Sequence, residues 1–194
     1  MKFTQIPVDA FEKLQMNAGF LCTDFNPSTG EVDEDDLIGA TTGGISINIV
    51  PSFADMGEDV DNCPKNTKEL KKISDWEVTA SGTFVTVSSD SAKSLVGAAD
   101  VSGNKITPRV DLSTNDFADL WFVGDYSDKN GATNGGFLAV KILNALSTGG
   151  FAIKTADKEK GQFAFEYTGH TSISAQDIVP AEIYVKAGTA EPTT

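Results

Sequence analysis

The chain has 194 residues, 40% of them hydrophobic, which is enough to fold around a core and excludes an intrinsically disordered protein. Its net charge of -13 is concentrated at the front, where residues 1–61 hold 12 Asp and Glu but only two Lys. Such a chain is not expected to bind nucleic acid, because affinity for phosphate requires clustered Lys and Arg. The simplest explanation of the negative charge is solubility, and a negative surface would also repel DNA.

No segment suggests a membrane or a secretory route. No apolar run approaches the roughly 20 residues of a transmembrane helix, and the start MKFTQIPVDAFEK lacks the apolar stretch of a signal peptide. We therefore expect folding in a cytosol, with Cys22 and Cys63 as free thiols, since nothing in their spacing asks for a disulfide. The sequence has no CxxC motif or Cys/His cluster to hold zinc.

The N-terminal part predicts one short helix and one short strand. Asp9 followed three residues later by Glu12 resembles a capping box, which predicts a helix of two turns. A strand is predicted at 19–24. The acidic run at 31–36 invites comparison with a calcium site, but it lacks the glycine and the closing Glu of an EF-hand loop. We interpret it as a solvated loop.

The central feature is a long hairpin predicted over residues 43–87. In both of its strands apolar and polar residues alternate with period two, as in a strand with one buried and one wet face. The buried-side residues are Ile45, Ile47 and Ile49 in the first strand, and Trp76, Val78, Ala80, Gly82 and Phe84 in the second. Between the strands lies a charged connection at about 57–72, and a loop of that length is more often functional than not.

The second half predicts one more helix and several strands. Ser89 or Asp90 caps a short helix that ends near Gly97. Strands are predicted at 104–112, where Pro108 favours an edge; at 116–126, buried on both faces; at 137–146, 151–155 and 162–172, as a meander with tight turns; and at 178–188. A turn is predicted at 127–136, and residues 190–194 are expected to fray.

Together these elements predict a mainly β fold. Eight or nine alternating strands with Gly-rich turns and one or two short flanking helices are typical of an antiparallel β-sandwich or barrel. In the strand at 162–172, Phe163, Phe165 and Tyr167 are predicted to face one way and Gln162, Glu166, Thr168 and His170 the other. No repeat or linker divides residues 1–194, so a single domain is expected.

The sequence carries no catalytic signature. It has no G-x-S-x-G nucleophile elbow, no P-loop and no G-x-G-x-x-G. Its single histidine, His170, cannot supply both a metal site and a base. Carboxylate pairs for glycoside hydrolysis always exist among 28 acidic residues, but nothing selects two of them. We therefore expect a protein that is not an enzyme and that has no cofactor and no metal.

An ordered set of segments resembles one protein family. The segments are IPVDAFEKLQMNAGFL (6–21), IGATTGGI (38–45), FADMGEDVDNCPKNTKELKKISDWEVTASGTFVTV (53–87), SLVGAAD (94–100), DLWFVGDYS (119–127), LNALSTGGF (143–151), KGQFAFEYTGHTS (160–172) and VPAEIYVKAGT (179–189). Over nearly its whole length the chain resembles the major tail protein, the tail tube subunit of long-tailed bacteriophages of Gram-positive hosts. No single segment is specific on its own.

The resemblance implies a structural protein of the virion tail, assembled in the cytoplasm of the bacterial host. It implies a sandwich or barrel core flanked by a short helix, with six subunits closing into a ring and rings stacking into a tube. The genome passes through this tube without binding it. The implied partners are other copies of the chain, a tape-measure protein, a baseplate initiator and a tail terminator, with no membrane. The chain would be the form without an added C-terminal immunoglobulin-like domain.

Two sets of residues can be assigned on that basis. The charged connection at 57–72 has an acidic half and a basic half, which suits a contact between subunits or rings. Its residues are Glu58, Asp59, Asp61, Lys65, Lys68, Lys71 and Lys72. The candidates for a lumen that repels DNA, as opposed to an outer surface, lie on polar strand faces: Ser46, Asn48, Glu77, Thr79, Ser81, Thr83 and Glu166. Repulsion is screened beyond roughly 8–10 Å, so only carboxylates on the lumen wall would matter.

Two other classes remain open. A tube subunit of a phage-derived injection machine or bacteriocin would have the same fold and ring. A β-sandwich that binds a ligand, such as a carbohydrate, would expose several aromatic residues on one face. Trp76 and Trp121 lie within apolar patterns and are expected to be buried, which counts against a binding module.

Overall fold

The computed structural model describes residues 17–125 and 136–187, and these residues are mainly β. Their strands are β1 (Phe20–Cys22), β2 (Thr41–Asp55), β3 (Lys71–Phe84), β4 (Ala99–Ser102), β5 (Lys105–Pro108), β6 (Ala118–Asp125), β7 (Phe137–Ser147), β8 (Ala152–Lys154), β9 (Gln162–Thr168) and β10 (Ala181–Lys186). Their helices are α1 (Ser89–Val96) and the 3-10 turns η2 (Glu34–Asp36), η3 (Lys68–Leu70) and η4 (Thr114–Asp116). The helix predicted near Asp9, most of the turn predicted at 127–136 and the end at 190–194 lie outside the described residues.

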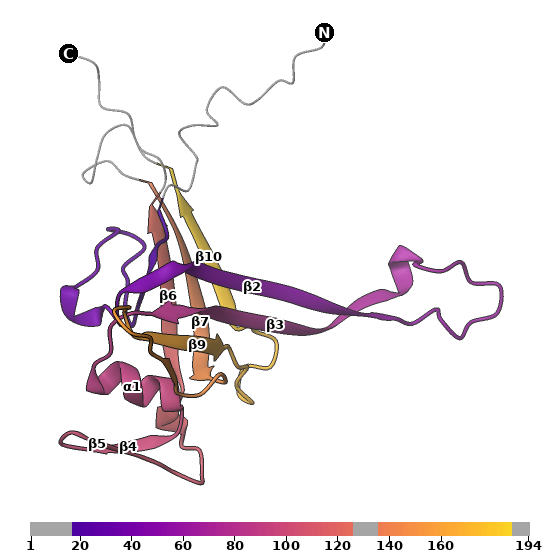
Figure 1. The fold of residues 1–194 in the computed structure, drawn as a ribbon. Helices are drawn as coiled ribbons and strands as arrows, with labels where there is room; N and C mark the ends of the chain where they lie inside the picture. Colours follow the sequence, from indigo (N-terminus) through magenta and orange to yellow (C-terminus); the bar gives the residue numbers. More distant parts are fainter. Residues whose placement is uncertain (1–16, 126–135, 188–194) are drawn as a thin grey trace, which may run out of the picture.

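Eight of the described strands form two layers, and all their pairings are antiparallel. One layer has the order β1–β6–β7–β10, and the other has the order β2–β3–β9–β8. In Figure 1 strands β2, β3 and β9 run across β6, β7 and β10. The antiparallel sandwich predicted from the sequence is thus consistent with the architecture.

Strand β7 belongs to both layers. Its first part, from Phe137, pairs with β6 on one side and β10 on the other. Its last residues, Leu146 and Ser147, pair with Thr168 and Tyr167 of β9. Strands that switch sheets in this way form the corners of sandwiches with crossing layers.

The main core lies between the layers, as the period-two pattern predicts. Ile47 of β2 lies opposite Ala80 of β3, and Ala80 lies opposite Tyr167 of β9, so these side chains share one face. Phe84 and Phe165 stack with ring centroids 4.3 Å apart, and both are buried. From the other layer, β6 and β7 contribute Leu120, Phe122, Val140 and Ile142.

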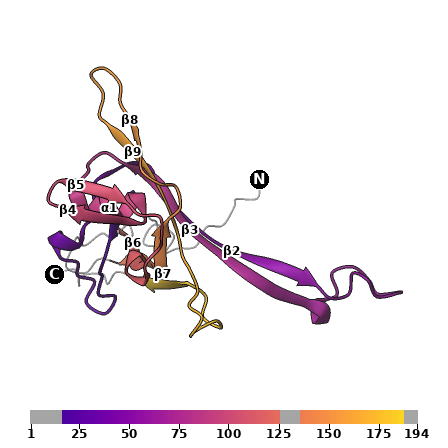
Figure 2. The same ribbon diagram turned by 90° about the horizontal axis from the view of Figure 1, so that it is seen from below.

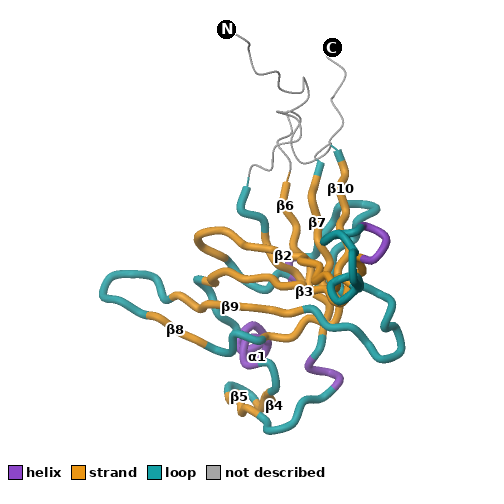
Figure 3. The backbone as a smooth tube through the Cα atoms, turned by 90° about the vertical axis from the view of Figure 1, so that its right-hand side faces the viewer, coloured by secondary structure: helices purple, strands orange, loops and turns teal. Residues whose placement is uncertain are grey.

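Helix α1 closes one end of this core, beneath β9 in Figure 3. Its cap is Ser88, whose hydroxyl accepts a hydrogen bond from the Ser91 backbone N–H while the Ser91 hydroxyl accepts one from the Ser88 N–H. The prediction of Ser89 or Asp90 as cap was therefore wrong by a residue or two. The helix ends before Gly97, as predicted, with φ of 84° at that glycine.

Several predicted connections differ from the structure. The meander was wrong: β8 pairs with β9, but β7 pairs with β6 and β10, and only its end reaches β9. Strand β4 was not predicted; it forms a separate hairpin with β5. The strand predicted at 104–112 ends at Pro108, because the ring removes a hydrogen-bond donor.

Three aromatic side chains test the burial expectations. Trp121 is buried, as expected, with only 5% of its surface exposed. Trp76 is only partly buried, which is less than the sequence predicts. His170 is not on the polar face of a strand: it follows β9, is half-buried, and packs edge-on against Phe117 with centroids 5.3 Å apart.

Candidate functional site

The β2–β3–β9–β8 layer has one face that the rest of the described chain leaves uncovered. Ser46 lies opposite Ser81, which lies opposite Glu166; in the next row Asn48 lies opposite Thr79. All of these side chains are at least partly exposed. The seven residues predicted to line a lumen therefore lie together on one face: Ser46, Asn48, Glu77, Thr79, Ser81, Thr83 and Glu166. The period-two alternation correctly predicted that these residues lie on the face opposite the core, because successive side chains of a strand point to opposite faces.

Hydroxyl and amide groups dominate this face, which we call the hydrophilic face. Its carboxylates are Glu77 and Glu166, with Asp75 at the start of the arm described below. Lys154 of β8 lies opposite Gln162 at one end of the same face, and Lys72 continues it at the other. The centre of the face therefore carries negative charge, and the two lysines lie at its margins.

The two outer strands of this layer have an unpaired edge. β2 pairs only with β3 and β8 only with β9 among the described residues. Pro51, within β2, fits this position, because proline is tolerated in sheets mainly at edges. N–H groups alternate in direction along an antiparallel strand, so the N–H groups of Ile47 and Ile49 face the same free edge as the Pro51 nitrogen. Such an edge can accept another strand.

The far part of the β2–β3 hairpin, residues 51–76, projects from the body, and we call it the arm. Figures 1 and 2 show it extending well beyond the layers, in a different direction from the β8–β9 hairpin. The loop at its end, residues 56–70, is braced at its base. One Asp55 oxygen accepts a bond from Gly57 N–H at 3.0 Å, and the other accepts one from Asn66 N–H at 3.2 Å. The arm is therefore an ordered projection rather than a loose linker.

The charges of the arm are divided as the sequence indicates. Glu58, Asp59 and Asp61 lie in the end loop, and all are exposed. Lys65 and Lys68 follow in the same loop, whereas Lys71 and Lys72 belong to β3; the predicted loop boundary of 72 was therefore too long. Lys68 lies 3.4 Å from Glu69, an exposed pair that contributes little on its own. We call Lys65, Lys68, Lys71 and Lys72 the lysine strip.

The arm also exposes apolar side chains that the sequence analysis did not single out. Phe53, Met56, Val60 and Ile73 are each more than half exposed. Phe53 follows the alternation that marks core residues nearer the body, whereas Ile73 pairs with it only through a register shift between Ser52 and Phe53; Lys71 lies over the Phe53 ring at 5.0 Å. The period-two alternation of β2 continues beyond the second layer. The same alternation therefore marks buried residues near the body and an exposed residue, Phe53, on the arm.

At the opposite end of β2, the acidic loop (residues 23–37) covers the outer face of the β6–β7 layer. Phe25 is buried there, with its ring edge-on to Trp121 at 5.5 Å and to Phe137 at 5.1 Å. The Thr23 hydroxyl donates to the Asp36 carboxylate at 2.9 Å, which ties the ends of the loop. Burial, with smaller contributions from Asp36 and Asp24, raises the pKa of the nearby Cys22 thiol to about 12.

Two open clefts lie on the surface of the described residues. Residues of the acidic loop line an open cleft of about 240 Å³, and a second cleft of about 320 Å³ lies where the arm meets residues 171–180. Within residues 17–125 and 136–187, no group of three or more His, Cys, Asp or Glu is arranged to hold a metal. No helix in those ranges is long and apolar enough to cross a membrane.

Comparison with known proteins leaves the family of this chain open. No protein-family model matches the sequence, and no curated protein matches it. Three surfaces of the described residues bear on function: the hydrophilic face with its free edges, the arm, and the acidic loop.

Proposed function

We propose that this chain is a structural subunit that polymerises as stacked rings into a hollow tube, the tail tube of a long-tailed bacteriophage. The observation that carries the proposal is the β2–β3–β9–β8 layer, which has one buried face, one uncovered hydrophilic face and two unpaired edges. When β2 of one copy pairs with β8 of the next, the four-stranded sheets of the two copies join into one continuous sheet. The phage context comes from the sequence resemblance.

Closing such a sheet into a ring leaves a usable channel. Neighbouring strands lie about 4.8 Å apart, so six copies with four strands each give a circumference of roughly 115 Å and a diameter of about 37 Å before strand tilt. In this proposal the hydrophilic face lines the channel, and the burial of the apolar face against the second layer supports that orientation. The channel wall would then present hydroxyl and amide groups with the carboxylates of Glu77 and Glu166, which repel phosphate, and lysines only at its margins.

The arm supplies a further contact in this proposal. It stands clear of its own body and exposes apolar side chains together with charges of both signs. Exposed apolar clusters of this kind mark surfaces that other molecules cover. The same subunit would also serve in a phage-derived injection machine, and neighbouring genes for a contractile sheath would distinguish that case.

Electron microscopy of the concentrated protein tests the proposal directly. We expect rings or hollow tubes in negative stain, either spontaneously or after addition of tail tips from the same phage as seeds. Amide hydrogen exchange gives a residue-level test, because strand pairing protects edge N–H groups: Ile47 and Ile49 should exchange more slowly in assembled than in unassembled protein. Separate particles that no seed extends would contradict a tube role and favour a β-sandwich that binds a ligand.

A further inference from the structure

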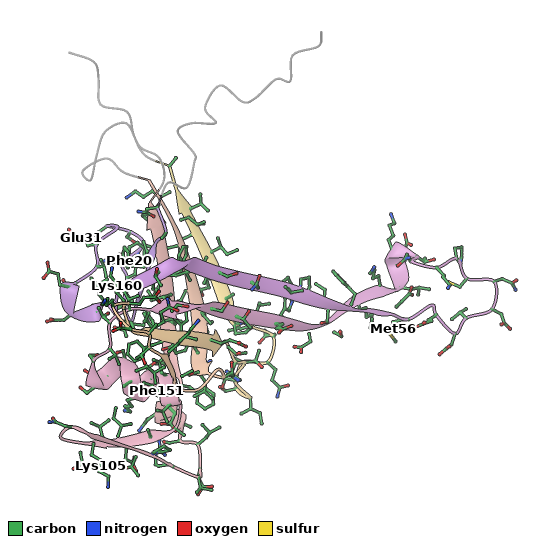
Figure 4. The ribbon with its side chains drawn as sticks, viewed as in Figure 1. Phe20, Glu31, Met56, Lys105, Phe151 and Lys160 are labelled. Atoms are coloured by element: carbon green, nitrogen blue, oxygen red, sulfur yellow. The ribbon has the colours of Figure 1, made fainter. Side chains whose placement is uncertain are left out.

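A strongly acidic and a strongly basic segment lie at opposite ends of this molecule. The acidic loop holds six Asp and Glu and no Lys or Arg, whereas residues 62–73 hold four Lys and one Glu. Figure 4 labels Glu31 of the first and Met56 of the arm on opposite sides of the body. The 15 residues of β2 span about 45–50 Å between them, so the two segments cannot meet within one copy.

Both segments are held in a fixed shape before any partner arrives. The acidic loop is anchored by the buried Phe25 ring and tied by the Thr23–Asp36 hydrogen bond. The loop of the arm is tied by the Asp55 carboxylate to the backbone N–H groups of Gly57 and Asn66. Association of preformed surfaces loses less conformational entropy than association of flexible ones.

Apolar side chains lie beside both sets of charges. Phe53 and Ile73 share a side of the arm with Lys71, which lies over the Phe53 ring, whereas Lys72 lies on the opposite side. Leu37 is 44% exposed at the end of the acidic loop. Exposed apolar side chains beside charges are typical of an interface, where apolar burial provides affinity and charge pairing provides register.

We propose that the lysine strip of one copy docks on the acidic loop of a second copy. This inference rests on the proposed function and names the contact that the arm makes in the assembly. Each copy donates one arm and accepts one, so the contact is head-to-tail and propagates around a ring or along a filament. The acidic loop thereby has a specific partner, the basic part of a neighbouring arm.

Zero-length cross-linking tests the contact without depending on tubes. A carbodiimide joins Lys to Asp or Glu only where the side chains touch. With equal amounts of nitrogen-15-labelled and unlabelled full-length protein, we expect mixed-isotope peptides that join residues 65–72 to residues 31–36. Association of copies without any such peptide would overturn the inference, as would peptides that join only residues within one copy.

Charge reversal supplies a second test. The arm variant carries Lys65→Glu, Lys68→Glu and Lys72→Glu; it spares Lys71, which contacts Phe53 within its own chain. The acidic-loop variant carries Asp33→Lys, Glu34→Lys and Asp35→Lys; it spares Asp36, which binds Thr23. Each variant alone should need about tenfold or more protein to associate, measured by sedimentation velocity. An equimolar mixture should associate again, because the acidic arm of one variant can dock on the basic loop of the other, and the basic arm of the second on the acidic loop of the first.

A single chain that carries all six changes should also associate alone. The matched control is Lys105→Glu, Lys158→Glu and Lys160→Glu, the same change in net charge at exposed positions away from the arm, which should associate like the original protein. The inference fails if either variant associates normally, or if neither the mixture nor the combined chain recovers. If the mixture pairs in solution but the original protein forms no ring or tube even with seeds, the tube proposal fails and this contact stands.

Discussion

The Phe165 ring occupies the space in which Gly82 would carry a side chain. A Cβ built at Gly82 would lie 2.6 Å from Phe165 Cζ, and the two residues are direct partners across β3 and β9. The ring cannot easily turn aside, because it packs against Phe84 at 4.3 Å and Tyr167 at 5.8 Å between centroids. A glycine near the C-terminal end of β3 therefore makes room for the stacked rings of Phe84, Phe165 and Tyr167 in the main core.

Gly82→Ala should destabilise the protein by about 1–3 kcal/mol, because the added methyl group overpacks this site. Urea unfolding measures the change. Gly161→Ala is the control: its Cβ would meet nothing closer than 3.8 Å, so its effect should stay within about 0.5 kcal/mol. In a Phe165→Leu background the Gly82→Ala penalty should shrink. Equal penalties in both backgrounds would show that the ring is not the cause.

The two thiols should react differently in the folded protein. Cys22 is completely buried and its pKa is raised to about 12, mainly by burial, whereas Cys63 is partly exposed on the arm. At pH 8 iodoacetamide should label only Cys63, and Cys63→Ala should abolish labelling until the protein unfolds. Mass spectrometry identifies the labelled site; rapid labelling of Cys22 in native protein would contradict its burial.

The same thiol predicts a pH dependence. In the unfolded chain Cys22 loses its proton near its ordinary pKa of 9.0, whereas in the folded protein it keeps the proton to about pH 12. Between these values deprotonation favours the unfolded state, so the stability conferred below pH 9 should decline as the pH rises toward 12. Denaturant melts at several pH values should show a shallower decline for Cys22→Ala than for the original protein.

The Asp55 carboxylate should control the order of the arm without affecting the core. Asp55→Ala removes both hydrogen bonds to the loop, so cleavage after Lys65 or Lys68 by a lysine-specific protease should accelerate about tenfold. The thermal midpoint should change little, because neither core cluster includes a residue of 56–70. Asp61→Ala, an exposed change in the same loop, is the control and should cleave at the original rate.

Deleting residues 58–67 should leave a folded protein that cannot polymerise. The core does not depend on this segment, but the deletion removes much of the arm loop and one lysine of the strip. Circular dichroism checks the fold and electron microscopy the assembly. A Gly/Ser segment of equal length in the same place should also fail to assemble if side chains make the contact. Tubes built by the deletion variant would contradict a contact role for the loop.

The hydrophilic face can be tested by reversing its charge. In tubes of Glu77→Lys and Glu166→Lys protein, the channel wall would attract phosphate, so added duplex DNA should be retained at low salt and released at high salt. Co-sedimentation measures retention. Asp111→Lys, on an exposed loop away from that face, is the control and should retain none. Equal retention by both variants would place the hydrophilic face outside the channel.

The sequence predicts faces in this protein better than it predicts neighbours. Alternation along β2, β3 and β9 identified the core side and the seven residues of the hydrophilic face, because a period of two depends only on local geometry. Which strand pairs with which depends on contacts distant in sequence. The meander therefore failed at β7, whose partners β6 and β10 lie on either side of it in the chain.

The arm and the acidic loop show the same difference between what local sequence predicts and what it does not. The charges of the arm are visible in the sequence, but the exposure of Phe53 is not, because Phe53 continues the alternation of the core residues before it. Ile73 breaks that alternation and pairs with Phe53 only through the register shift in the ladder. Which apolar residues of β2 and β3 are covered depends on how far the second layer extends along β2. The local sequence pattern does not show that distance. Likewise, six carboxylates mark the acidic loop, but only the fold shows that it lies a full strand away from the lysines.

Because β7 pairs with both layers, it also determines how a pulling force would travel through this molecule. A load on the arm would pass along β3 to β9, then through the pairs that Leu146 and Ser147 make, into β7 and its partners β6 and β10. Each step crosses main-chain hydrogen bonds, so the layers cannot slide apart unless that ladder breaks. A chain of such molecules joined through their arms would be stiff along its length. Under load, the contacts between copies would break before the strand ladders within each copy.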